Sequence, residues 1–144
     1  MSGSLVKMRF KDPDNPLRGL IIDDQQTMRR IVRQLLKQIG ITQIEEAKNG
    51  RDALEILDDP QAKMPDFVIC DLHMDKMDGL EFCNKLRLNK KEQLRQIPVI
   101  ILTGDQDRFM REVSEQVGAT VILSKPVTAD QLHDSISDVI GFVV

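Results

Sequence analysis

Four short apolar runs along the chain each lead into polar residues, and this pattern restricts the possible folds more than any other feature. Short apolar runs bounded by turn residues are typical of strands that are buried on both faces of a parallel sheet. In open α/β sheets, ligands bind just beyond the carboxyl ends of the strands. The runs, each with its polar end, are Leu20–Ile22 with Asp23 and Asp24, Phe67–Cys70 with Asp71, Val99–Leu102 with Thr103, and Val121–Ser124 with Lys125. The pattern therefore predicts that three carboxylates, a hydroxyl and an amine gather at one edge of a parallel sheet.

Segments with helical periodicity alternate with these strands. From Met28 to Ile39 the apolar residues have the spacing of an amphipathic helix, and Gly40 follows as a helix stop. The strand Gln43–Ala47 has few apolar residues, which suits the edge of a sheet. Further helices are predicted over residues 51–57, 79–86, 109–117 and from a capping box at 128–131 to residue 140 or 143, and residues 89–96 are predicted to form a polar connection. This alternation predicts an α/β fold with helices on both faces of the sheet.

Composition excludes several classes of protein. With 144 residues, of which 41% are hydrophobic, the chain can form a single domain with a sizeable core. Its net charge of −3 predicts no nucleic-acid partner, and no apolar stretch approaches the roughly 18 residues of a membrane span. The N-terminus lacks the apolar segment of a secretory signal, so the cytoplasm is the expected compartment. Cys70 and Cys83 lack metal or redox spacing and are expected to be buried, reduced thiols.

The polar residues at the strand ends are the types that phosphoryl transfer to a carboxylate needs. Asp23, Asp24 and Asp71 would repel one another when packed together, and a Mg²⁺ ion bound among them would relieve that repulsion. A carboxylate can also accept a phosphoryl group covalently. Thr103 and Lys125 would offer a hydroxyl and an ammonium to the phosphoryl oxygens. The constellation therefore points to a magnesium-dependent aspartyl-phosphate site, and so to a signalling switch.

Each of these residues has a simpler interpretation when taken alone. An Asp-Asp pair after a strand is most often a turn and helix N-cap, and a Lys-Pro pair is commonly a solvated turn. A Thr at the end of a strand is usually an ordinary strand or cap residue. The functional interpretation depends on their joint occurrence, in order, each at the end of its own strand.

Over residues 17–143 the chain resembles the receiver domains of bacterial two-component response regulators. The resemblance rests on Asp23-Asp24, the segment 71–79, Thr103-Gly104 and Lys125-Pro126, and residues 27–33 and 49–54 are especially similar to single-domain chemotaxis regulators. It implies a flavodoxin-like (βα)5 three-layer sandwich with a five-stranded parallel sheet of order 2-1-3-4-5. Residues 1–16 are then an irregular N-terminal extension or the remnant of a tag, and residues 17–144 form the receiver domain.

The same resemblance implies a role for each site residue. Asp71 is the implied phosphoacceptor, and Asp24 and Asp71 are implied Mg²⁺ ligands, with Asp23 acting mostly through water. The backbone carbonyl of His73 is the implied third protein ligand.

The resemblance also implies partners and an output. Thr103 and Lys125 would hold the phosphoryl oxygens in the active state, and the donor would be a phosphohistidine on a sensor histidine kinase or phosphotransfer protein. If the chain is complete, the output is contact with a further, unidentified protein, and we expect a monomer or a weak dimer.

The sequence departs from the pattern of the family in three places. In the family, the residue three positions before the Lys that corresponds to Lys125 is usually aromatic. Here it is Ile122, so an aromatic gate cannot operate. Asp75 replaces the usual Pro after Met74. His73 and Asp105 occupy positions that tune the loss of phosphate in the family, and we expect their side chains to set the phosphoryl lifetime.

Four other interpretations stay open at this point. A pseudo-receiver would keep the fold without accepting phosphate, and a receiver cut from a larger regulator or hybrid kinase would have the same sequence features. A phosphohydrolase with an Asp nucleophile would need a second acid where His73 stands. A cofactor-binding flavodoxin-like protein would need a phosphate-binding loop where Asp23 to Gln26 is acidic.

Basic residues on the first helix form one further feature. Arg29, Arg30, Arg33 and Lys37 are predicted to make a solvated basic face. This face is either plain surface or, as the resemblance implies, a docking site for the helical bundle of a kinase.

Overall fold

A five-stranded parallel sheet forms the centre of the molecule, as the sequence predicts. The computed structural model describes residues 14, 16–74, 76–104 and 108–140, of which 108–110 without their side chains. Its strands are β1 (Arg18–Ile22), β2 (Gln43–Ala47), β3 (Phe67–Asp71), β4 (Val99–Thr103) and β5 (Val121–Ser124). Their order is β2-β1-β3-β4-β5, and every neighbouring pair is parallel. The expected order is confirmed, with the weakly apolar β2 at an edge.

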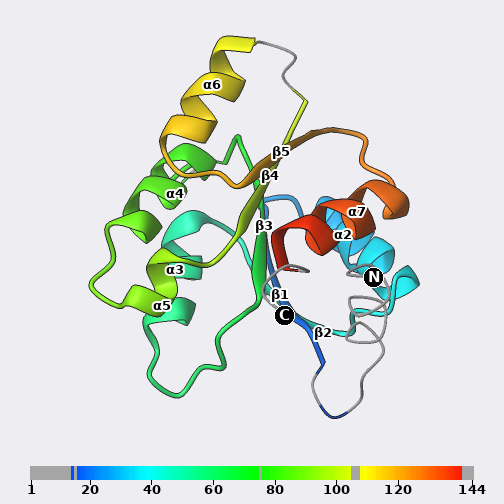
Figure 1. Cartoon of the computed structure of the whole chain (residues 1–144), viewed down its shortest axis with the longest axis horizontal. Helices are drawn as coiled ribbons and strands as arrows, with labels where there is room; N and C mark the ends of the chain where they lie inside the picture. Colours follow the sequence, from blue (N-terminus) through cyan, green and yellow to red (C-terminus); the bar gives the residue numbers. More distant parts are fainter. Residues whose placement is uncertain (1–13, 15, 75, 105–107, 141–144) are drawn as a thin grey trace.

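Helices cover both faces of this sheet, which makes three layers (Figure 1). On one face lie α2 (Gln26–Gln38) and α7 (Ala129–Ile140). On the other lie α3 (Gly50–Asp58), α4 (Gly79–Arg87), α5 (Glu92–Arg95) and α6 (Arg108–Gln116). Among the described residues, no helix is both long and apolar enough to cross a membrane.

The core consists of two apolar layers, one on each side of the sheet. Successive residues of a strand point to opposite faces, so Leu20 and Ile22 pack with α3 and α4, whereas Ile21 packs with α2. All five residues of β3 and of β4 are buried, as expected for central strands covered on both faces. Cys70 and Cys83 are buried free thiols in the layer beneath α4, which confirms that prediction.

Helix ends follow the local signals in the sequence. The capping box before α7 forms in both directions, since the Gln131 amide N–H donates to Thr128 Oγ1 and the Thr128 N–H donates to Gln131 Oε1. Gly40 and Gly118 adopt φ angles of +94° and +109° after α2 and α6, where a left-handed residue ends the helix.

Two local predictions are wrong. The segment 89–96 is not simply a polar connection, because α5 forms within it and buries Leu94 completely. Ile31, assigned to the buried stripe of the first helix, is 44% exposed, because the apolar face of α2 is centred on Val32 and Leu36. The possible extension of α7 to residue 143, the irregular segment 1–13, Asp75 and Asp105 lie outside the described residues.

Candidate functional site

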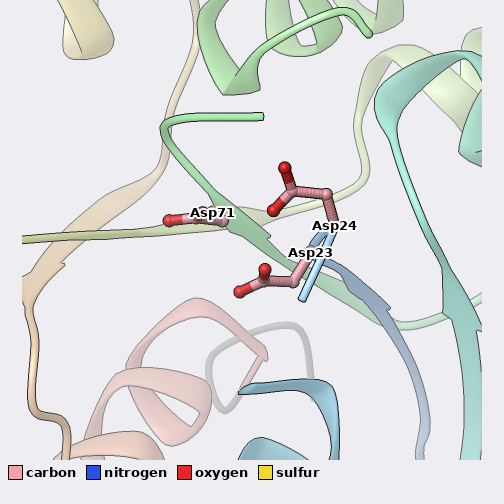
Figure 2. A group of neighbouring side chains, drawn as sticks. All are labelled: Asp23, Asp24 and Asp71. Carbon is pink, nitrogen blue, oxygen red and sulfur yellow. The ribbon is translucent and has the colours of Figure 1, made fainter. Parts of the chain in front are cut away.

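Three carboxylates meet where β1 and β3 end. Asp23 and Asp24 follow β1 directly, and Asp71 is the last residue of β3. The two strands are paired neighbours, with Ile22 opposite Cys70, so their carboxyl ends lie at the same level. Carboxylate oxygens from the three residues lie within 4.8 Å of one another (Figure 2). The predicted gathering of these side chains is therefore observed.

Lys125 reaches the site from the end of the edge strand β5. It follows β5 directly, and its Nζ lies 2.7 Å from Oδ1 of Asp71. The Asp71 side chain is 9% exposed and that of Lys125 is 24% exposed, so this ion pair is largely shielded from water. An ammonium at this position can neutralise charge that develops on Asp71 or on a group attached to it.

Thr103 is the last residue of β4, the strand that lies between β3 and β5. The residue is 2% exposed, and its carbonyl accepts a hydrogen bond of 2.8 Å from the Lys125 N–H. The next residue, Gly104, is exposed, and a Cβ built on it would meet no atom within 4 Å. The space beside Thr103 is thus open.

Burial and a surplus of carboxylates both act on the pKa of Asp23 at this site. The pKa of Asp23 lies above its ordinary value of 3.8, chiefly because burial disfavours the charged form. Asp71 and Asp24 raise this pKa further by repulsion, against the lowering effects of the Gln25 N–H and of Lys125. A set of carboxylate oxygens that repel one another is chemically suited to a hard divalent cation.

The acidic pair is not used to cap α2. The N-cap residue is Gln25, without a side-chain capping bond, and Asp23 Oδ1 accepts the Gln25 N–H at 2.9 Å. Within the part of the chain that the structure describes, the side chain of Asp24 makes no hydrogen bond. The simpler interpretation of Asp24 as a helix cap is therefore wrong.

The loop after β3 passes close to α4, and glycine permits this approach. The Gly79 N–H donates to the Leu72 carbonyl at 2.9 Å. A Cβ built on Gly79 would lie 2.7 Å from the carbonyl oxygen of Asp71. The start of α4 is therefore packed directly against the backbone that carries Asp71.

The predicted solvated basic face is only partly present. Arg29 is 9% exposed and donates from Nη1 to the backbone carbonyl of Asp23 at 2.7 Å. Arg29 and Arg33 also bind the two carboxylate oxygens of Glu46 on β2, at 3.0 Å and 2.7 Å. Arg30 and Lys37 are exposed, as predicted. The position of Arg29, one and two turns before the buried Val32 and Leu36, was the signal that it faces inward.

The residues at which the chain departs from the family pattern occupy different positions. His73 is exposed in the loop after β3, and its ring is not part of the carboxylate cluster. Ile122 is half-buried on β5 and packs against the core layer beneath α3 and α4. Arg111 on α6 donates to the Ile122 carbonyl at 3.4 Å and to the Ser124 hydroxyl, so polar bonds tie α6 to this strand.

Comparisons with known proteins agree with this geometry. The family described as the response regulator receiver domain matches residues 20–137. A Rhizobium etli protein named "Probable chemotaxis protein CheY" is 34% identical over 125 residues, which cover 87% of this chain and 93% of that protein. The sensory/regulatory protein RpfC of Xanthomonas campestris is 33% identical over 131 residues, which cover 91% of this chain but only 18% of RpfC.

Solved structures show the same likeness. The signal receiver domain of a histidine kinase from Syntrophus aciditrophicus superposes with a TM-score of 0.76 at 31% identity, covering 88% of this chain and 91% of that one. The chemotaxis response regulator CheY4 of Vibrio cholerae gives a TM-score of 0.74 at 28% identity, covering 85% and 98%. Taken with the fold and the acidic strand ends, these matches show that the chain belongs to the family of response regulator receiver domains of two-component signalling.

Proposed function

We propose that this receiver domain is a switch that is controlled by phosphorylation of Asp71. The observation that carries the proposal is the set of charged groups around the Asp71 carboxylate. Asp71 ends the central strand β3, has two further carboxylates within 4.8 Å, and is paired with Lys125 at 2.7 Å. A largely shielded ion pair beside a surplus of negative charge adds little net stability, so its presence favours a function over a purely structural role.

The proposed reaction transfers a phosphoryl group onto the protein itself. An oxygen of the Asp71 carboxylate attacks the phosphorus of a phosphohistidine, the O–P bond forms, and the N–P bond breaks with its electrons going to the imidazole. Water later cleaves the acyl phosphate and releases inorganic phosphate. Lys125 and Thr103 stabilise the charge on the phosphoryl oxygens, and the open space at Gly104 accommodates the group.

The acidic cluster is the proposed site for Mg²⁺. Asp24 and Asp71 would be direct ligands together with the His73 carbonyl, and Asp23 would act mostly through water. When bound, the ion would neutralise charge between the carboxylates and the incoming phosphoryl group. The residues themselves hold and orient the carboxylates, and repulsion by Asp71 and Asp24 adds to burial in raising the pKa of Asp23.

The proposed partners follow from the chemistry of the donor. A sensor histidine kinase or a phosphotransfer protein would supply the phosphohistidine, and the phosphorylated form would bind a different protein from the unphosphorylated one. The proposed output is therefore a change in protein–protein binding, and the domain would turn over no external substrate. Its similarity to CheY proteins and to receivers within longer sensory proteins is compatible with chemotaxis or with another two-component pathway.

Intact-mass measurement tests the proposal directly. The protein is incubated with acetyl phosphate and Mg²⁺, beside Asp71→Asn and the surface control Asp138→Asn, which replaces an exposed carboxylate on α7. We expect a labile adduct of one phosphoryl group on the parent and on the control, and none on Asp71→Asn.

Two outcomes would contradict the proposal. An adduct that survives in Asp71→Asn would place the acceptor elsewhere. No adduct on the parent, together with no Mg²⁺ binding, would identify a pseudo-receiver whose partner binding does not depend on phosphorylation.

A further inference from the structure

Arg29 connects the acidic cluster to the edge of the sheet through a set of bonds that the proposed reaction does not use. Its Nη1 donates to the Asp23 carbonyl at 2.7 Å, and its Nε donates to Glu46 Oε1 at 3.0 Å. The arginine side chain is 10% exposed, and its bond to Asp23 is buried. A guanidinium that is buried in this way is fixed in one orientation by its planar set of donors.

The backbone N–H, the backbone carbonyl and one carboxylate oxygen of Asp23 each have a hydrogen-bond partner. Its N–H donates to the Ala47 carbonyl on β2 at 3.1 Å, its carbonyl accepts from Arg29, and its Oδ1 accepts from the Gln25 N–H. The backbone between Asp23 and Asp24 can therefore not rotate without breaking the Arg29 bond. This peptide links the two neighbouring carboxylates that Figure 2 shows beside Asp71.

The arginine acts here through geometry rather than through its charge. It binds the backbone carbonyl of Asp23 and not the carboxylate. Its positive charge is matched by Glu46, whose other oxygen is held by Arg33 at 2.7 Å. Arg33 in turn donates to the Ile44 carbonyl, so it anchors the same glutamate to β2 without contacting the acidic pair.

We propose that Arg29 is a positioning residue that sets the affinity of the acidic cluster for Mg²⁺. By fixing the Asp23 carbonyl, it holds the carboxylates of Asp23 and Asp24 where they converge with that of Asp71. The inference rests on the proposed function, since it assigns to Arg29 a part in the same metal site. Outer-shell partners of this kind typically change metal affinity by about 10- to 100-fold when they are removed.

The test compares Arg29→Gln with Arg33→Gln. Both variants remove one arginine from Glu46, but only the first removes the bond to Asp23. Isothermal titration calorimetry with MgCl₂ measures affinity, and thermal unfolding without Mg²⁺ measures the general cost to stability. A third variant, Arg29→Lys, keeps the positive charge but lacks the planar set of guanidinium donors. It replaces Arg29→Gln in the comparison if Arg29→Gln does not fold.

We expect Arg29→Gln to raise the Kd for Mg²⁺ about 10-fold, at the lower end of the range for outer-shell partners. Arg29→Lys should fall between that value and the parent, and Arg33→Gln should stay within about 2-fold of the parent even if it loses similar thermal stability. With acetyl phosphate, Arg29→Gln should need more Mg²⁺ for half-maximal phosphorylation. Its rate at saturating Mg²⁺ should match the parent, because the hydrogen bonds of Arg29 that the structure describes go to Asp23 and Glu46 and not to Asp71 or Lys125.

The inference is overturned if Arg29→Gln, or Arg29→Lys in its place, has the same Kd as Arg33→Gln. It is also overturned if the rate of phosphorylation stays low at saturating Mg²⁺, because the defect would then not lie in metal affinity. Failure of the proposed function would look different, since the parent protein itself would bind no Mg²⁺ and accept no phosphoryl group.

Discussion

Gly79 shows how the position of Asp71 depends on a residue that has no side chain. A Cβ at this position would lie 2.7 Å from the Asp71 carbonyl oxygen and 3.1 Å from the Leu72 Cα, both of which belong to the backbone. Backbone atoms cannot turn aside as the end of a flexible side chain can. An added methyl group would therefore push α4 away from the end of β3.

We predict that Gly79→Ala lowers the free energy of unfolding by about 1–3 kcal/mol, the usual cost of forcing an extra carbon into a packed site. Gly104→Ala is the matched control, because its Cβ would meet nothing within 4 Å and its stability should change by less than about 0.5 kcal/mol. Urea unfolding of both variants checks the prediction. Equal stability of the two would show that the loop before α4 adjusts freely.

At the scale of elements, α2 and β2 are joined by a charged cluster that the sequence alone does not reveal. Arg29 and Arg33 lie one helical turn apart, and both bind Glu46 on the edge strand. Burial raises the pKa of Glu46, but the hydrogen bonds from Arg33 and Arg29 outweigh it and hold the pKa below its ordinary value of 4.5. The charged form of Glu46 is thus favoured by folding.

This shift fixes the sign of a dependence on pH. Because the folded pKa is lowered, the stabilisation by Glu46 is complete above pH 4.5 and is lost as the pH falls through the folded value. Glu46→Gln should cost about 1–2 kcal/mol near neutral pH, and this difference should shrink on acidification. Urea unfolding along a pH series measures it, with Glu45→Gln, an exposed neighbour on β2, as control. A difference that does not change with pH would contradict the assignment.

In the charged cluster, the sequence predicts which way Arg29 faces but not which residue it binds. The spacing of Arg29 from Val32 and Leu36 indicates an inward-facing residue, because helix neighbours lie three and four positions apart. It does not indicate a partner, since Glu46 reaches α2 only once β2 takes its place beside β1. The capping box at Thr128, in contrast, involves residues within one turn and could be predicted from the sequence.

At the scale of the whole molecule, the site was predictable because the topology of the sheet determines where most of its residues lie. Asp23, Asp71, Thr103 and Lys125 each stand at the end of a strand, and parallel strands place those ends on one side of the sheet. The strand order came from family resemblance rather than from the residues. The close approach of Gly79 to Asp71 needed the structure, because it depends on how the loop between β3 and α4 folds back.

The acidic cluster also affects the stability of the whole molecule. The raised pKa of Asp23, due first to burial and then to repulsion by Asp71 and Asp24, means that folding disfavours its charged form. Without a cation, this residue makes the protein less stable as the pH rises from 3.8 through the folded value, opposite in sign to Glu46. A bound cation would reverse the penalty.

We predict that Asp23→Asn is more stable than the parent without Mg²⁺, because it removes a carboxylate whose charged form is disfavoured by burial and by repulsion. An asparagine oxygen can still accept the Gln25 N–H that Asp23 Oδ1 accepts at 2.9 Å. In saturating Mg²⁺ the order should reverse, since an ion at 100 times its Kd stabilises the folded parent by about 2.7 kcal/mol and the variant binds it less tightly. Thermal unfolding of both proteins with EDTA and with MgCl₂ measures this crossing. If Asp23→Asn were the less stable protein in EDTA, the carboxylate would be stabilising the fold, and the cluster would not be a site strained by the lack of a cation.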